Sequence, residues 1–148
     1  MIQLKPNRDF KNLDRYVKKM DKNLKTGVKR GLESVGMFLV GEIKKDITKK
    51  SQGSRRAVRR GKKVWVSPPN TSPNHDTGEL RSSIMWEIMS GGDSVFVGST
   101  VFDKGEHLEL GTKRMKPRPY LQPNIEKNQA KAADIFMERI RKYMSTGR

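Results

Sequence analysis

The side chains best suited to acid–base or nucleophilic chemistry lie around a proline-rich segment and the stretch that follows it. His75 and Asp76 are adjacent, and they shortly precede Ser82 and Ser83, a set that a hydrolase could use. A catalytic triad, however, needs a histidine oriented by a separate carboxylate, and two adjacent residues in a proline-rich loop do not supply that geometry. The Gly-x-Ser-x-Gly signature is absent as well. The sequence therefore predicts that the protein is not an enzyme.

Metal and phosphate sites are not indicated by the sequence either. The only histidines are His75 and His107, which lack the i, i+4 spacing of helical zinc ligands, and there is no cysteine. Gly91-Gly92 lacks an adjoining Gly-Lys-Ser/Thr sequence, so it suits a hairpin turn rather than a phosphate loop. We expect no metal and no cofactor. The lack of cysteine also suits a protein made in a reducing cytoplasm.

Positive charge is the strongest chemical feature of the sequence. The chain has 32 Lys and Arg residues against 16 Asp and Glu residues, which gives a net charge of +16. Self-repulsion of this size favours a partner that offsets it: nucleic acid, an acidic protein surface or an anionic membrane. The most basic window, which contains almost no apolar residue, comprises Lys44, Lys45, Lys49, Lys50, Arg55, Arg56, Arg59, Arg60, Lys62 and Lys63.

We expect residues 44–78 to form a basic and proline-rich loop. Within it, residues 44–63 should be exposed and mobile and should approach DNA or an acidic neighbour. Trp65, within the short strand candidate 64–66, is the one aromatic residue nearby, too few for stacking on successive bases. A contact with nucleic acid should therefore involve the phosphate backbone and be independent of sequence. The residues expected to make it are Arg55, Arg56, Arg59, Arg60, Lys62 and Lys63.

A long helix should precede this basic window. From Leu13 to Ile47, apolar residues recur at steps of three or four along one face, which predicts an amphipathic helix with Asn12 as its N-cap. Residues 1–11 are then expected to be an N-terminal arm. The glycines around 27–31 favour either a break in the helix or close packing by another element.

A hairpin and a second helix should follow the basic window. Residues 80–89 alternate between apolar and polar side chains, which predicts a half-buried strand, and residues 94–98 predict the returning strand. Pro123 is well placed as the first residue of the last helix. We expect Ile84 and Trp86 to be buried against this helix at Ile135 or Phe136.

The basic stretch between the hairpin and the last helix has the composition of an interface. Pro117 and Pro119 stiffen it, so ordering it costs little entropy. Arginine guanidinium groups suit carboxylates of a neighbouring chain, and an aromatic–arginine patch is typical of interface hot spots. The alternative is that the apolar residues cap this chain's own core while the arginines face water. The residues expected at an oligomer interface are Glu109, Arg114, Arg118, Tyr120 and Leu121.

Two motifs in this region resemble a known family. The run Asp76-Thr77-Gly78-Glu79-Leu80-Arg81-Ser82-Ser83-Ile84 is followed by a glycine-containing strand, and then by Leu108-Glu109-Leu110-Gly111-Thr112-Lys113-Arg114-Met115-Lys116-Pro117-Arg118-Pro119-Tyr120-Leu121-Gln122-Pro123. In order and spacing they resemble the neck or tail-completion proteins of long-tailed double-stranded DNA phages. Leu110 stands where that family often has an aromatic residue.

The resemblance implies a virion structural protein that assembles in the host cytoplasm. It implies a homo-oligomeric ring, hexameric or else dodecameric, between head-connector and tail-terminator proteins, around a channel for double-stranded DNA. Two other hypotheses remain open. A stand-alone nucleic-acid-binding protein without sequence specificity is supported by charge alone, and a toxin-like nuclease lacks an active-site constellation.

The expected architecture is a single α+β domain spanning residues 1–148. It should consist of a long N-terminal helix, a small antiparallel sheet, a basic proline-rich arm and a C-terminal helix packed on the sheet. We expect no membrane partner, because the longest nearly apolar run, residues 35–41, is far shorter than the roughly 18 residues that span a bilayer.

Overall fold

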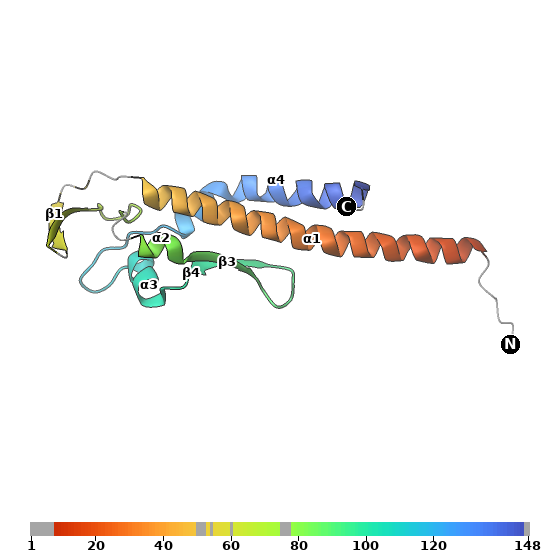
Figure 1. Cartoon of the computed structure of the whole chain (residues 1–148), viewed down its shortest axis with the longest axis horizontal. Helices are drawn as coiled ribbons and strands as arrows, with labels where there is room; N and C mark the ends of the chain where they lie inside the picture. The colour runs from red at the N-terminus through yellow and green to blue at the C-terminus, as the bar shows by residue number, and fades with distance from the viewer. Residues whose placement is uncertain (1–7, 50–52, 54, 60, 75–77, 147–148) are drawn as a thin grey trace.

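One long helix is the axis of the fold. The computed structural model of the protein describes residues 8–49, 53, 55–59, 61–74 and 78–146. Helix α1 runs from Arg8 to Thr48 as one uninterrupted helix of 41 residues, and it extends along nearly the whole molecule (Figure 1). The helix therefore begins before Asn12, which is not its N-cap, and within the segment expected to be an arm. Residues 1–7 lie outside the described part of the chain.

The C-terminal helix packs along α1. Helix α4, Gln122–Thr146, contacts α1 where glycines replace larger side chains. A Cβ atom on Gly27 would lie 3.3 Å from Ile140 Cα, and one on Gly31 would lie 2.6 Å from the ring of Phe136. Of the two alternatives given for these glycines, close packing by another element is therefore correct. The other alternative, a break in the helix, is wrong, because α1 is continuous here. Val35, Leu39 and Ala132 form the buried centre of this contact.

The sheet covers a different side of α1. Strands β3, Ile84–Ile88, and β4, Val95–Ser99, pair antiparallel as predicted, with Trp86 opposite Val97. The core between them and α1 comprises Val40, Ile43, Ile47, Leu80, Ile84 and Tyr120. Figure 1 shows α4 on one side of α1 and the β3–β4 sheet on the other.

The α+β fold class is confirmed, but two packing details differ from prediction. Helix α4 packs mainly on α1 rather than on the sheet. The ring of Trp86 lies over Gly36 of α1, where a Cβ atom would be 2.6 Å from the ring, instead of against Phe136. The reason is that the glycines of α1 occur on more than one face of the helix and admit bulky neighbours on both.

The strand predicted over residues 80–89 is only partly correct. Its first part is a short helix, α2, Glu79–Ser83, preceded by Gly78 with a left-handed φ of 80°. Leu80 and Ser83 are both buried in this helix, and their spacing of three residues fits one helical turn. The same short stretch also fits the alternation of a strand, so its sequence pattern is ambiguous. After β4 comes helix α3, Phe102–Leu110.

The basic window is also more structured than predicted. Strands β1, Arg55–Arg59, and β2, Lys62–Val66, form a separate antiparallel hairpin whose turn includes Gly61 at a φ of 75°. The prediction of a loop is therefore wrong for residues 55–59, 62 and 63. The strand candidate 64–66 lies within β2, and residues 44–47 lie in α1, as the helix predicted up to Ile47 had it. Strand β1 was missed because its arginines obscure the apolar alternation, whereas a hairpin ladder is held by backbone hydrogen bonds.

Candidate functional site

The basic arm between α3 and α4 is folded tightly at its base. Gly111 has a φ of 80°, and a Cβ atom there would lie 2.8 Å from the carbonyl oxygen of Met115. The Thr112 amide donates to the Met115 carbonyl at 2.8 Å, and the Met115 amide donates back at 3.2 Å. This closed turn leaves Lys113 and Arg114 exposed at the tip of the arm.

Glu109 is an internal cap of α4. Its Oε2 atom accepts hydrogen bonds from the amides of Tyr120 and Leu121 at 2.8 and 3.0 Å. Its Oε1 atom accepts one from the Gln122 amide at 2.9 Å. The carboxylate thus satisfies amides at the start of α4, where negative charge is also favoured by the helix dipole. The carboxylate is therefore engaged within its own chain, and a contact of Glu109 with a neighbouring chain stays a prediction.

Tyr120 and Leu121 belong to the chain's own core. Tyr120 has an exposed fraction of 0%, and Leu121 is half-buried against the same cluster. Burial raises the pKa of the Tyr120 hydroxyl above its usual value, and the Ser99 hydroxyl offsets this only in part. A side chain with no exposed surface cannot anchor a second protein. The assignment of Tyr120 to an oligomer interface is thus wrong, and the alternative, in which it caps the core, is correct.

Arg118 ties the arm to the segment that follows the β1–β2 hairpin. Its Nε atom donates to the Ser67 carbonyl at 3.0 Å, and its backbone amide donates to the Leu108 carbonyl at 2.7 Å. A further bond of 2.9 Å joins the Asn70 amide to the Pro117 carbonyl. Arg118 is half-buried as a residue, and its Nε atom serves the packing of its own chain.

The hairpin and the tip of the arm together form what we call the basic end of the molecule. Both lie at the C-terminal end of α1, opposite the N-terminal part of that helix (Figure 1). Lys63 on β2 is exposed, as are Lys113, Arg114 and Lys116 on the arm. The backbones of Arg55, Arg56, Arg59 and Lys62 lie in the hairpin strands, and Arg60 lies outside the described residues.

Asp46 is a structural junction that the sequence analysis did not single out. Its carboxylate accepts hydrogen bonds from the Ser72 hydroxyl and, at 3.0 Å, from the Asn124 side chain, and it pairs with Lys49 at 3.3 Å. It thereby connects α1, the proline-rich segment and α4. Burial by itself raises the pKa of Asp46. The interactions with Ser72, Asn124 and Lys49 lower it by more, so the pKa lies below its usual value. The available signal was that Asp46 is the one acidic residue in the basic window.

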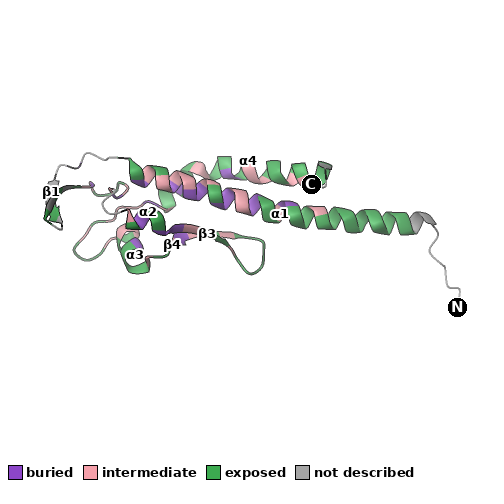
Figure 2. Ribbon diagram, viewed as in Figure 1, coloured by how far each residue is buried: buried purple, intermediate pink, exposed green. Residues whose placement is uncertain are grey.

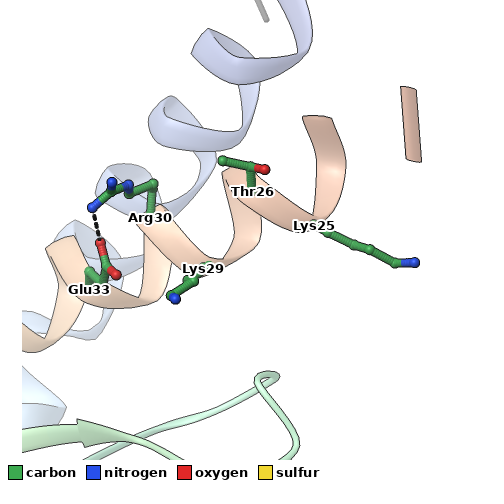
Figure 3. Close-up of a pocket in the computed structure, with 5 residues that line it drawn as sticks. All are labelled: Lys25, Thr26, Lys29, Arg30 and Glu33. Atoms are coloured by element: carbon green, nitrogen blue, oxygen red, sulfur yellow. Dashed lines mark hydrogen bonds and ion pairs between the residues drawn. The ribbon is translucent and has the colours of Figure 1, made fainter. Parts of the chain in front are cut away.

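An open depression of ≈ 420 Å³ lies on α1 and is lined by Lys25, Thr26, Lys29, Arg30 and Glu33. Figure 3 shows Arg30 directed at Glu33, with which it forms an ion pair of 2.8 Å, whereas Lys25 points away from them. The hydrogen bond with Glu33 raises the pKa of the Arg30 guanidinium. Because the cations do not converge, this arrangement does not form an anion-binding site.

Neither a metal centre nor a bilayer span occurs in the described ranges. No group of three or more His, Cys, Asp or Glu side chains within them could hold a metal ion. None of the helices described is long and apolar enough to cross a membrane. Comparisons of the chain with protein families, with curated proteins and with solved structures find no match.

Proposed function

We propose that the protein is a structural component of a phage neck, repeated in a ring at the head–tail junction and joining the tail to the capsid connector around the DNA channel. The observation that supports this most directly is that the residues of the phage-like motifs hold one folded unit together. Leu80, Ile84 and Tyr120 share one core, although the motifs that contain them are separated by the β3–β4 hairpin. These motif residues therefore serve the fold, and the assignment to a phage neck rests on the resemblance of the motifs themselves.

The distribution of exposed residues also supports a role in assembly. The N-terminal part of α1 is exposed along its length and exposes apolar side chains (Figure 2). The opposite end of the molecule is basic. A chain with separate apolar and cationic surfaces suits a multi-protein assembly, in which different neighbours cover different surfaces.

The basic end is the part that we assign to the DNA channel or to an acidic connector protein. Its exposed cations, Lys63, Lys113, Arg114 and Lys116, are held on a hairpin and on a closed turn, so little conformational entropy is lost when a partner binds. Arg114 is the member of the predicted interface that stays exposed, and we assign it to contact with a neighbouring protein.

A second candidate function is that of a stand-alone nucleic-acid-binding protein. The specific observation in its favour is the β1–β2 hairpin, because two-stranded ribbons enter the grooves of DNA in several binding proteins. The phage proposal additionally accounts for the motif residues, which nucleic-acid binding by itself does not explain.

The proposal is tested by deletion and complementation in the phage whose genome encodes the chain. We expect the deletion to give filled heads and separate tails, and the wild-type chain supplied in trans to restore joined virions. Arg114→Glu should fail to restore them, while Lys22→Glu, the same charge change at another exposed position, should succeed. Normal virions from the deletion phage would overturn the proposal.

A further inference from the structure

The N-terminal part of α1 has an apolar face that no described residue of its own chain covers. Within residues 11–26 every side chain except Asn23 is exposed. We call the apolar residues here the extension stripe, and they lie at helical spacing along one side. Their exposed fractions are 58% for Leu13, 61% for Tyr16, 55% for Val17, 40% for Met20 and 44% for Leu24.

This stripe continues the line along which α4 packs. In that contact Gly27 meets Ile140 and Tyr143, and Gly31 meets Phe136. Counting about 100° per residue, Leu13, Val17, Met20 and Leu24 fall on the same side of α1 as Gly27 and Gly31. The α4 helix ends at Thr146, close to Gly27, so the extension stripe projects beyond it. This side of α1 therefore already packs against a helix further along, at Gly27 and Gly31.

A matching uncovered surface lies on the outer side of α4. Ala130, Ala133, Met137 and Met144 are all exposed and are spaced by three, four and seven residues, which places them on one face. We call them the outer α4 stripe. Two alanines give room for bulky side chains of an approaching helix, as the glycines of α1 do within the chain.

Charge permits a second copy to approach along these surfaces despite the net charge of +16. One edge of the extension stripe bears the ion pairs Asp14–Lys18 and Asp21–Lys25, both at 2.8 Å, which are locally neutral. The cations Lys11, Arg15 and Lys22 lie, by helical geometry, on the opposite face of α1. The approach is therefore apolar on the α1 side. On α4, two exposed charged side chains of opposite sign, Glu126 and Arg141, lie by helical geometry on the same face as the outer α4 stripe.

We propose that the extension stripe of one copy packs on the outer α4 stripe of the next copy, head to tail. Each chain has one stripe of each kind, so this pairing covers both, whereas pairing α1 with α1 in a twofold dimer leaves every outer α4 stripe open. Head-to-tail contacts close into rings when the rotation between copies allows it. The inference rests on the ring of the proposed function and specifies which surfaces form it.

Cysteine cross-linking tests the pairing directly, because the natural chain has no cysteine. Met20→Cys and Met137→Cys are made as separate full-length proteins and oxidised alone and as an equal mixture. We expect a linked dimer from the mixture and little from either protein alone, and a ladder of oligomers from the double variant. Equal linkage of Met20→Cys alone would overturn the inference in favour of α1–α1 pairing, and absence of any link at concentrations where the wild type is oligomeric would overturn it too.

Association in solution gives an independent test by analytical ultracentrifugation. Val17→Gln with Met20→Gln should weaken self-association by about 100-fold or more, since burial of each apolar side chain contributes about tenfold or more. Ala133→Gln with Met137→Gln should have a similar effect. Arg15→Gln with Lys22→Gln, on the opposite face of α1, is the matched control and should leave association unchanged or strengthen it. Circular dichroism should remain unchanged in all three, since these side chains are exposed.

The outcomes separate this inference from the proposed function. Rings that form without the link between positions 20 and 137 would overturn the pairing and leave the neck proposal standing. A linked ladder, combined with normal virions from the deletion phage, would overturn the neck proposal and support the pairing. A wild-type chain that stays monomeric at every concentration would overturn the pairing.

Discussion

The Glu109 carboxylate accepts a hydrogen bond of 2.8 Å from the backbone amide of Tyr120, eleven residues further along the chain. This bond connects the end of α3 to the start of α4 and fixes the path of the arm between them. The same carboxylate also accepts bonds from the amides of Leu121 and Gln122. One acidic side chain therefore holds the closed arm in place and leaves its exposed tip to meet a partner.

Replacing Glu109 by Gln should destabilise the protein. The amide keeps one acceptor oxygen but loses the charge and turns a donor toward backbone N–H groups, so we expect a loss of about 2 kcal/mol. Thermal unfolding followed by circular dichroism should show a melting temperature lower by roughly 4–8 °C. Glu106→Gln, at an exposed position of the same helix, is the control, and an equal effect in both variants would contradict the capping role.

Gly36 and Gly41 provide a matched pair on one helix. A Cβ atom on Gly36 would lie 2.6 Å from the Trp86 ring, whereas no atom of the described residues lies within 4 Å of one on Gly41. Gly36→Ala should therefore cost about 1–3 kcal/mol through overpacking. Gly41→Ala should stabilise by up to about 1 kcal/mol through helix propensity. Chemical denaturation measures both, and destabilisation by Gly41→Ala together with a neutral Gly36→Ala would show that the sheet does not pack on α1 as described.

Asp46 should make stability depend on acidic pH. The pKa of Asp46 in the folded protein lies below the ordinary 3.8. Its contribution to the free energy of unfolding is therefore fully present above that pH and is lost as the pH falls through the folded pKa. Asp46→Asn should consequently be less stable than the wild type at neutral pH, and the difference should narrow below pH 3.8. Urea unfolding across this range measures it.

Asp103→Asn, at an exposed position on α3, is the control for Asp46→Asn. It should stay within about 0.5 kcal/mol of the wild type. A difference between Asp46→Asn and the wild type that is constant from neutral to acidic pH would contradict the role assigned to the carboxylate.

The long helix, the β3–β4 pair and the last helix follow from periodicity that the sequence displays directly. The packing of these elements does not follow from periodicity. The sequence shows that Gly27, Gly31 and Gly36 lie within the helical pattern, but it does not show which side chain packs against each of them. Glu109 illustrates the same limit. It was expected at an oligomer interface, whereas the partners of its carboxylate in the structure are backbone amides that are close to it only in the folded state.

The basic hairpin illustrates a different limit. Strand β1 consists of Arg55-Arg56-Ala57-Val58-Arg59, whose composition resembles a solvated loop, and its pairing with β2 is a non-local property of the backbone. The exposed extension stripe, by contrast, was visible in the sequence as part of the apolar face of α1. Periodicity identifies such an apolar face without showing whether the chain itself covers it.

Replacing the cations of the hairpin should change the salt dependence of DNA binding. Each phosphate neutralised by a cation releases counterions, so affinity for duplex DNA should fall steeply as salt rises. The variant Arg55→Gln, Arg56→Gln, Arg59→Gln, Lys63→Gln should flatten the slope of log affinity against log salt. Fluorescence anisotropy measures this, with Lys18→Gln and Lys25→Gln as a control remote from the basic end. An unchanged slope in the hairpin variant would remove DNA contact from the hairpin.

Electron microscopy of the purified full-length chain, with and without duplex DNA, tests the central claim most directly. The account predicts closed rings of uniform copy number that form without DNA, because the proposed contacts join copies of the chain to one another. Class averages should show a central opening wide enough for a DNA duplex to pass. A chain that stays monomeric and forms only continuous coats along DNA would contradict the claim and favour the nucleic-acid-binding alternative.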